Sequence, residues 1–329
     1  MKKFLVITTI NKPTEAVLRF LEILPDERKI IIVWDRKGPA DYIKHDRLIF
    51  LDIDTQYELY PEFAKALPEK HYARKNIWYY HAIKLWADYI AETDDDNIPY
   101  DFYPQFIDDK EFNCNVIEDL WSVNIYKYFT NKHIWPRWLD LQCINKDLDE
   151  SKISEKLIKP YIQHSLEDKD PDVDAIYRLV LWKEVIFDKN KNIALWNDTR
   201  CPFNTQNTYW HKEGFPFLYV PHTVIWRACD IWKSYIAQRG IKEIDGTILF
   251  QSPTVYQERN EHNLQIDFNE EVVCYKEAAN LIENLKNIDF WWNKTGKYII
   301  YEIYNKLIQL WYFKKEEIDS LNVRLKLFI

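Results

Sequence analysis

Glycine is scarce in this chain, with only five among 329 residues. Neither a GxxxxGK[ST] nor a GxGxxG pattern occurs, and both patterns need glycines where the backbone closely approaches a phosphate group. The sequence therefore argues against P-loop and dinucleotide-binding chemistry.

Cysteines are few and scattered, and long apolar runs are missing. The five cysteines form no CxxC pair, which argues against a zinc site or a disulfide framework and favours a reducing, cytoplasmic location. No segment approaches the roughly 20 apolar residues that span a bilayer, and the apolar run after Met1 is too short for a signal peptide. We therefore expect no transmembrane segment, with peripheral membrane association left open.

A basic character is also missing, whereas aromatic side chains are abundant. The net charge of −8 disfavours a nucleic-acid binder, although local cations can still hold an anionic small molecule. Aromatic residues make up 16% of the chain. Most are expected in the core, and some are expected to line a cleft, because aromatic faces stack on sugars and bases.

The first hundred residues alternate between strand and helix patterns. Apolar runs predict buried strands, and spaced apolar residues predict helices. The expected strands are 4–9, 29–34, 47–53 and 89–94, and the expected helices begin at Pro13 and span 74–87. This alternation predicts an α/β fold with a mostly parallel sheet flanked by helices.

The remaining chain is less regular. Residues 98–170 show poor periodicity, 174–182 fit a helix or a strand, 217–220 fit a strand, and 230–239 fit a helix. Helix-like patterns then cover 271–285, 295–312 and 315–327. We predict a catalytic domain over 1–270 and a helical C-terminal extension over 271–329.

Three consecutive carboxylates end the strand expected at 89–94. Side chains alternate along a strand, so Asp94 and Asp96 should face one side and Asp95 the other. Two carboxylates on one side suit Mg²⁺ or Mn²⁺, and ligands bind at the carboxyl ends of strands in α/β sheets. The alternative is a solvated acidic turn.

Other polar residues are expected near the same edge. Thr8 and Thr9 end the first strand, and Asp35 follows the second, where it either binds a ribose or base or belongs to an ordinary charged turn. His262 is the candidate for a further metal ligand, with a surface histidine as the alternative.

Cations begin the helix that precedes the acidic strand. Arg74, Lys75 and Asn76 stand where an anion would gain from both the side chains and the free backbone N–H groups. A solvated helix start is the alternative.

Asp230, beside Arg227 and Trp232, is a candidate general base, and Arg227 is a candidate donor-binding residue. The alternative is a helix N-cap, a position that aspartate favours. Asp170, Asp172 and Asp174 form a second acidic cluster that is either structural or supplies the base instead.

Several stretches together resemble STELLO-type glycosyltransferases, a family related in fold to the GT-A class. The matching pieces follow in order: VITTINKPTEAV (6–17), IIIVWDRKGP (30–39), YARKNIWYYHAI (72–83), ETDDDN (92–97), IWPR (134–137), DPDVDAIYRL (170–179), PFNTQNT (202–208), VIWRACDIWKSYIAQR (224–239) and ERNEHNL (258–264). They cover about residues 5–270 and leave the helical tail less well matched.

This resemblance implies a GT-A-like sheet with Asp94, Asp95 and Asp96 as a DXD motif for metal and sugar nucleotide. It also implies that the helix start at 74–76 belongs to the donor site. Trp78 and Trp138 stand where the family pattern has glycine, and their bulk is expected to narrow nearby space.

The leading hypothesis is a glycosyltransferase that uses Mn²⁺ or Mg²⁺. It would move a sugar from a nucleotide-diphosphate donor, with UDP favoured, to a polysaccharide or glycolipid hydroxyl. In it Asp94 and Asp96 hold the metal, Thr9, Asp35, Arg74 and Lys75 hold the nucleotide, and Asp230 deprotonates the acceptor, which implies inversion. The alternatives are a UDP-sugar mutase of the reversibly glycosylated polypeptide type, which needs no acceptor, and a non-catalytic sugar-nucleotide-binding partner.

Overall fold

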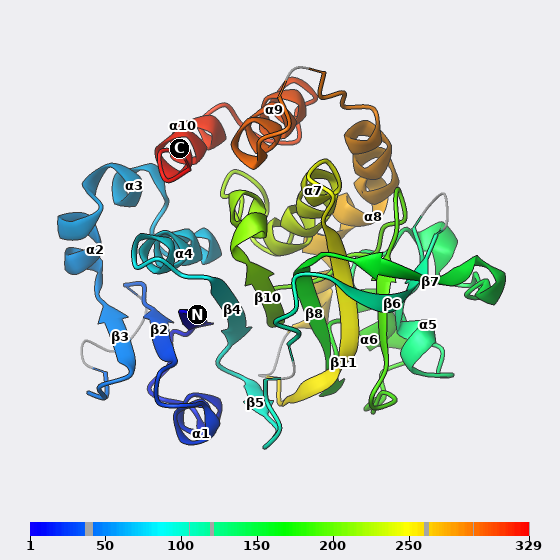
Figure 1. The fold of residues 1–329 in the computed structure, drawn as a ribbon, viewed down its shortest axis with the longest axis horizontal. Helices are drawn as coiled ribbons and strands as arrows, with labels where there is room; N and C mark the ends of the chain where they lie inside the picture. Colours follow the sequence, from blue (N-terminus) through cyan, green and yellow to red (C-terminus); the bar gives the residue numbers. More distant parts are fainter. Residues whose placement is uncertain (37–41, 105, 119–121, 260–262, 292, 329) are drawn as a thin grey trace.

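A computed structural model describes residues 1–36, 42–104, 106–118, 122–259, 263–291 and 293–328. These residues form one large central sheet with helices on its faces and a helical C-terminal region (Figure 1). The predicted α/β class with a helical C-terminal region is therefore confirmed.

The first half contains the parallel part of the sheet. Its strands are β1 (Lys3–Thr8), β2 (Lys29–Val33), β3 (Leu48–Leu51) and β4 (Tyr89–Asp94), and its helices are α1 (Glu15–Ile23), α2 (Ile53–Leu59), α3 (Pro61–Ala66) and α4 (Lys75–Lys84), with a 3₁₀ turn η1 (Tyr72–Arg74). All of the strands and helices expected here are present. The first helix begins later than expected, because Thr14 rather than Pro13 caps it by accepting a hydrogen bond from the Val17 amide.

The second half adds strands that the periodicity failed to predict. They are β5 (Asn97–Pro99), β6 (Phe112–Ile117), β7 (Ile153–Ile158), β8 (Pro160–Lys169), β9 (Asn192–Leu195), β10 (Asn207–His211) and β11 (Thr247–Gln257), with short helices α5 (Tyr126–Phe129) and α6 (Ala175–Val180) and 3₁₀ turns η2 (Leu141–Cys143) and η3 (Glu150–Lys152). These strands lack a clear apolar pattern because they contain buried polar residues. Gln163 accepts a hydrogen bond from the Ile107 amide, and His164 is hydrogen-bonded to Thr208. The strand expected at 217–220 is absent, because the 3₁₀ turn η4 (Lys212–Phe217) leads directly into a loop.

The strands run in the order β3-β2-β1-β4-β10-β8-β11-β9-β6-β7, with β5 paired to β11. The first four are parallel to one another, and β10 then runs antiparallel to both β4 and β8. This reversal places the end of β4 beside the start of β10. Segments from the two halves of the chain therefore meet where β4 ends.

Helices α7 (Cys229–Lys242), α8 (Leu264–Lys286), α9 (Gly296–Gln309) and α10 (Glu317–Leu325) form the C-terminal region. Figure 1 shows α10, α9 and α8 as an arc along one side of the molecule, with α4 and α7 between this arc and the strands. Side chains of α8, α9 and α10 share one buried cluster with those of the sheet. The domain division at residue 270 stays a prediction, and this position lies inside α8.

The loop after η4 is held by buried charges from α10. Arg324 donates to the Phe215 and Leu218 carbonyl oxygens at 2.7 and 2.6 Å. The Glu317 carboxylate accepts from the amides of His222 and Thr223 at 3.0 and 2.8 Å. The C-terminal helix thus fixes the segment that leads into α7.

All five cysteines lie among the described residues, where they are buried and form no disulfide bond. In the parts of the chain that the structure describes, no helix is both long and apolar enough to cross a membrane.

Candidate active-site cleft

The parallel strands bring the predicted polar residues to one edge of the sheet. In the register of β1, Thr8 stands opposite Val33 of β2 on one side and Asp94 of β4 on the other. Asp35 follows β2 by two residues and accepts hydrogen bonds from the Arg36 and His71 amides at 2.7 and 3.0 Å. These residues are neighbours because the carboxyl ends of parallel strands lie together.

The acidic triplet forms the end of β4 and the turn into β5. Asp94 and Asp96 both line a cleft of about 150 Å³. Asp95 is directed away from them, toward α1, where it accepts hydrogen bonds from Thr9 and, at 3.0 Å, from the Asn11 amide group. The predicted alternation of the three side chains is therefore confirmed.

The two carboxylates in the cleft are held by different partners. Asp94 accepts from the Tyr72 hydroxyl at 3.0 Å and lies 3.3 Å from the fully buried Lys75 ammonium. Asp96 accepts from the Gln257 amide at 3.0 Å. Burial raises the pKa of Asp94, against the opposing effect of Lys75. Burial, and then the nearby charge of Asp94, raise the pKa of Asp96 to about 6.

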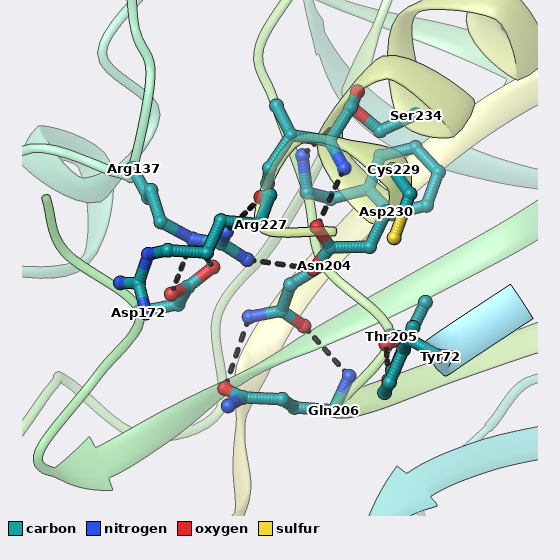
Figure 2. A network of polar contacts seen from close by, with 12 residues as sticks. Tyr72, Arg137, Asp172, Asn204, Thr205, Gln206, Arg227, Cys229, Asp230 and Ser234 are labelled. Carbon is teal, nitrogen blue, oxygen red and sulfur yellow. Dashed lines mark hydrogen bonds and ion pairs between the residues drawn. The ribbon is translucent and has the colours of Figure 1, made fainter. Parts of the chain in front are cut away.

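Arg137 joins two further carboxylates of the cleft, Asp172 and Asp230 (Figure 2). Its Nε atom lies 2.9 and 3.0 Å from the two Asp172 carboxylate oxygens, and its Nη2 atom lies 2.6 Å from Asp230 Oδ2. Burial lowers the pKa of Arg137, but the charges of Asp172 and Asp230 more than reverse this effect, so the guanidinium stays charged. Two buried carboxylates therefore share one cation.

Asp230 lies in the first turn of α7 and is not its cap. The N-cap of α7 is Ala228, which corrects the N-cap reading of Asp230. Burial raises the pKa of Asp230, and Arg137 opposes this shift. The side chain lines the cleft. One carboxylate oxygen accepts a hydrogen bond from Arg137, and the other accepts one from the Ile231 amide at 2.9 Å.

The second acidic cluster divides between structural positions and the cleft. Asp174 caps α6 and accepts from the Trp135 indole at 2.6 Å, and Asp170 pairs with Arg178 at 2.6 Å. Asp172 is the member of the cluster that lines the cleft. It is therefore the alternative to Asp230 as a base.

Three of the predicted donor-site residues are engaged elsewhere. Arg74 is buried and donates to the Ala64 and Leu67 carbonyl oxygens at 2.8 and 3.1 Å. Asn76 is buried and makes both backbone hydrogen bonds of Val220, at 2.7 and 2.8 Å. Arg227 borders the cleft, but its guanidinium pairs with Asp267 and Glu271 of α8 at 3.0 and 2.8 Å. Of the cations predicted for the donor, Lys75 is the one that contacts the acidic triplet.

The proposed metal ligand His262 lies outside the described residues. Among the residues that are described, no group of three or more histidine, cysteine, aspartate or glutamate side chains is arranged to hold a metal ion. Trp78 and Trp138 are buried in the core and are not among the residues that line the cleft. Their bulk therefore fills the interior instead of narrowing the cleft.

Sequence reasoning missed several residues of this cleft. Arg259 donates to Gln257 Oε1 at 3.0 Å, so the end of β11 supplies a cation beside Asp96, and Gln206 reaches the cleft from the loop before β10. Tyr72, Arg137, Gln206 and Arg259 all fall within the stretches that carry the family resemblance. The family resemblance of those stretches was therefore the one indication in the sequence that these four residues belong to the site.

Comparisons with known proteins agree with this resemblance. A family model described as STELLO glycosyltransferases matches residues 227–328. The chain is 26% identical over 275 residues to "Probable glycosyltransferase STELLO2" of Arabidopsis thaliana, a match that covers 78% of this chain and 36% of the relative. "Probable glycosyltransferase STELLO1" of the same plant is also 26% identical over 275 residues, with 78% and 35% covered. The chain thus spans about a third of the length of these relatives, and the family match extends through the helical tail that the sequence motifs left uncovered.

Proposed function

We propose that this chain is a metal-dependent glycosyltransferase whose cleft binds a nucleotide-diphosphate sugar, with UDP favoured as the nucleotide. The observation that carries this proposal is the meeting of Asp94 and Asp96 with Asp172 and Asp230 in one cleft. The similarity to proteins named as glycosyltransferases supports the reaction class.

The acidic pair fits a hard divalent cation. Asp94 and Asp96 are two partly exposed carboxylates that line the same cleft. Partial burial raises the pKa of both, and the charge of Asp94 raises that of Asp96 further. Mn²⁺ and Mg²⁺ favour oxygen ligands and complete their shells with phosphate oxygens and water, so two protein ligands suffice. A bound cation would stabilise the negative charge of the departing diphosphate.

The surrounding side chains position the donor. Lys75 holds Asp94 in place and adds a positive charge beneath the cleft, and Arg259 adds another next to Asp96. Thr8, Thr9 and Asp35 lie at the carboxyl ends of the neighbouring strands, where a base and ribose would extend away from the acidic pair. Asp95 also lies beside these residues, because its carboxylate accepts a hydrogen bond from the Thr9 hydroxyl.

Asp230 is the proposed base. It faces the cleft, and burial raises its pKa, which makes it a better proton acceptor than an exposed aspartate. It would accept the proton of a glycan or glycolipid hydroxyl as that oxygen attacks the anomeric carbon, with inversion there. The hydrogen bond from Arg137 fixes the orientation of the carboxylate.

A thermal-shift panel of nucleotide sugars, each with and without Mn²⁺, tests the donor site. We expect a shift that requires both the cation and one particular nucleotide, and that Asp96→Ala abolishes. Asp101→Ala is the control, because Asp101 is exposed and lies outside the cleft. A shift that survives Asp96→Ala, or the absence of any cation-dependent shift, would refute the proposal.

A further inference from the structure

A second hollow shares a wall with the cleft. This groove, of about 570 Å³, lies between the segment leading into α7, the helix α8 and the end of α9. Val224, Ile225 and Ala228 line the groove, whereas Trp226 and Arg227, from the same segment, line the cleft. Residues 224–228 therefore separate the proposed donor site from the groove by the thickness of one chain segment.

The groove combines aromatic rings with amide groups. The chain just after α9 contributes Trp311 and Tyr312, and α8 contributes Asn280 and Asn284. The Asn284 amide donates to the Tyr312 hydroxyl at 3.1 Å. Sugar rings pack their C–H faces on aromatic side chains, and amides both donate to and accept from sugar hydroxyls. This chemistry suits a carbohydrate.

The charge of the groove narrows the class of carbohydrate. Of the described residues that line it, Glu277 is the single charged one, and its carboxylate accepts from the Asn280 amide at 3.3 Å. An anionic sugar or a phosphate headgroup would be repelled by this carboxylate, and no cation among the described lining residues would offset the repulsion. A neutral glycan would not be repelled in this way.

Trp311 is the most unusual residue of the groove. It is 92% exposed and has a φ of 66°, a left-handed conformation that disfavours bulky side chains. It directly follows the C-cap residue Leu310 of α9, where glycine is preferred. No ring contact to Trp311 occurs among the residues that the structure describes. Because Trp311 lines the groove, its exposed indole is available to pack against a bound sugar ring.

We propose that this groove binds the acceptor, that the acceptor is a neutral oligosaccharide, and that Trp311 stacks on one of its sugar rings. This inference rests on the proposed function, because it names the acceptor class of the same site. The shared wall at 224–228 would let an oligosaccharide lie in the groove with its terminal hydroxyl directed past Trp226 toward Asp230.

Saturation-transfer NMR with neutral tetra- to hexasaccharides of xylan, mannan, galactan and glucan tests this inference. We expect the wild-type protein to bind at least one of these oligosaccharides, Trp311→Ala to weaken that binding about tenfold or more, and Trp311→Phe to restore most of it. Trp86→Ala is the matched control and should bind like the wild type. Trp86 is also highly exposed, at 80%, has a φ of 63°, and precedes β4 at the end opposite Asp94.

Three results would overturn the inference: no member of the panel binds, Trp311→Ala binds as tightly as the wild type, or Trp311 is instead required for binding to phosphatidylcholine vesicles. The nucleotide-sugar thermal shift is measured on the same wild-type sample. Trp311-dependent oligosaccharide binding without any nucleotide-sugar shift would refute the proposed function and the acceptor role, while the groove would remain an oligosaccharide-binding site.

Discussion

A buried ion pair joins the two elements that carry the candidate catalytic carboxylates. Lys233 of α7 lies 2.7 Å from Glu92 of β4, and both side chains are fully buried. Lys233 stands one turn after Asp230, and Glu92 stands two residues before Asp94. Glu92 also accepts from the Trp210 indole at 2.8 Å. Lys233→Met, which replaces the charged side chain with an unbranched apolar one that is one atom shorter, is expected to destabilise the protein strongly.

The size of this loss follows from burial. Burial lowers the pKa of Lys233, and the charge of Glu92 opposes that shift. Removing one partner of a buried pair costs about 3–5 kcal/mol, because the remaining charge stays buried without compensation. A chain of 329 residues unfolds with an entropy of about 0.7 kcal/mol per kelvin. The melting temperature of Lys233→Met should therefore fall by about 4–7 °C.

Differential scanning calorimetry of three variants tests this reasoning. Lys242→Met is the control, because Lys242 lies on the same helix and pairs with Asp198 at 2.6 Å, but both side chains are about one-third exposed. Such a pair contributes at most about 1 kcal/mol, which corresponds to about 1.5 °C here. The double variant Glu92→Gln/Lys233→Met leaves no unpaired charge and should recover at least half of the loss. The reasoning fails if Lys233→Met behaves like Lys242→Met, or if the double variant is no more stable than Lys233→Met.

Three further predictions concern the cleft and its support. Because the pKa of Asp96 is raised to about 6, the unliganded protein should lose stability as the pH rises from about 4 to 6, and Mn²⁺ affinity should fall about tenfold per pH unit below 6. Asp96→Asn should remove both effects in thermal-shift titrations. Asp230→Asn should lower transfer at least about 100-fold while the Mn²⁺-dependent donor shift persists, and intact transfer would disprove the base assignment. Asn76→Ala should destabilise the protein by about 2–4 kcal/mol in urea unfolding, because both backbone groups of Val220 lose their partners; a loss below about 1 kcal/mol would contradict this role.

Sequence reasoning succeeded where local rules apply. The apolar runs of β1, β2 and β4 are buried strands, and the alternation of side chains placed Asp94 and Asp96 on one side. Both results depend on backbone geometry over a few residues. The same reasoning could not tell which residue of the helix start faces the cleft, because the three neighbours point in different directions. Lys75 points toward Asp94, Arg74 toward the Ala64 and Leu67 carbonyl oxygens, and Asn76 toward Val220.

The sequence by itself determined the α/β class, the strand that ends in the acidic triplet and the family resemblance, because each is written in residues that are close along the chain. The tertiary structure alone decided what surrounds the triplet. Arg137, Asp172, Asp230 and Gln257 come from distant segments, and the insertion of β8 and the antiparallel strand β10 between β4 and β11 brings them to one cleft. Hydrophobic periodicity could not reveal this, since buried polar residues that satisfy one another through long-range hydrogen bonds leave no local pattern in the sequence.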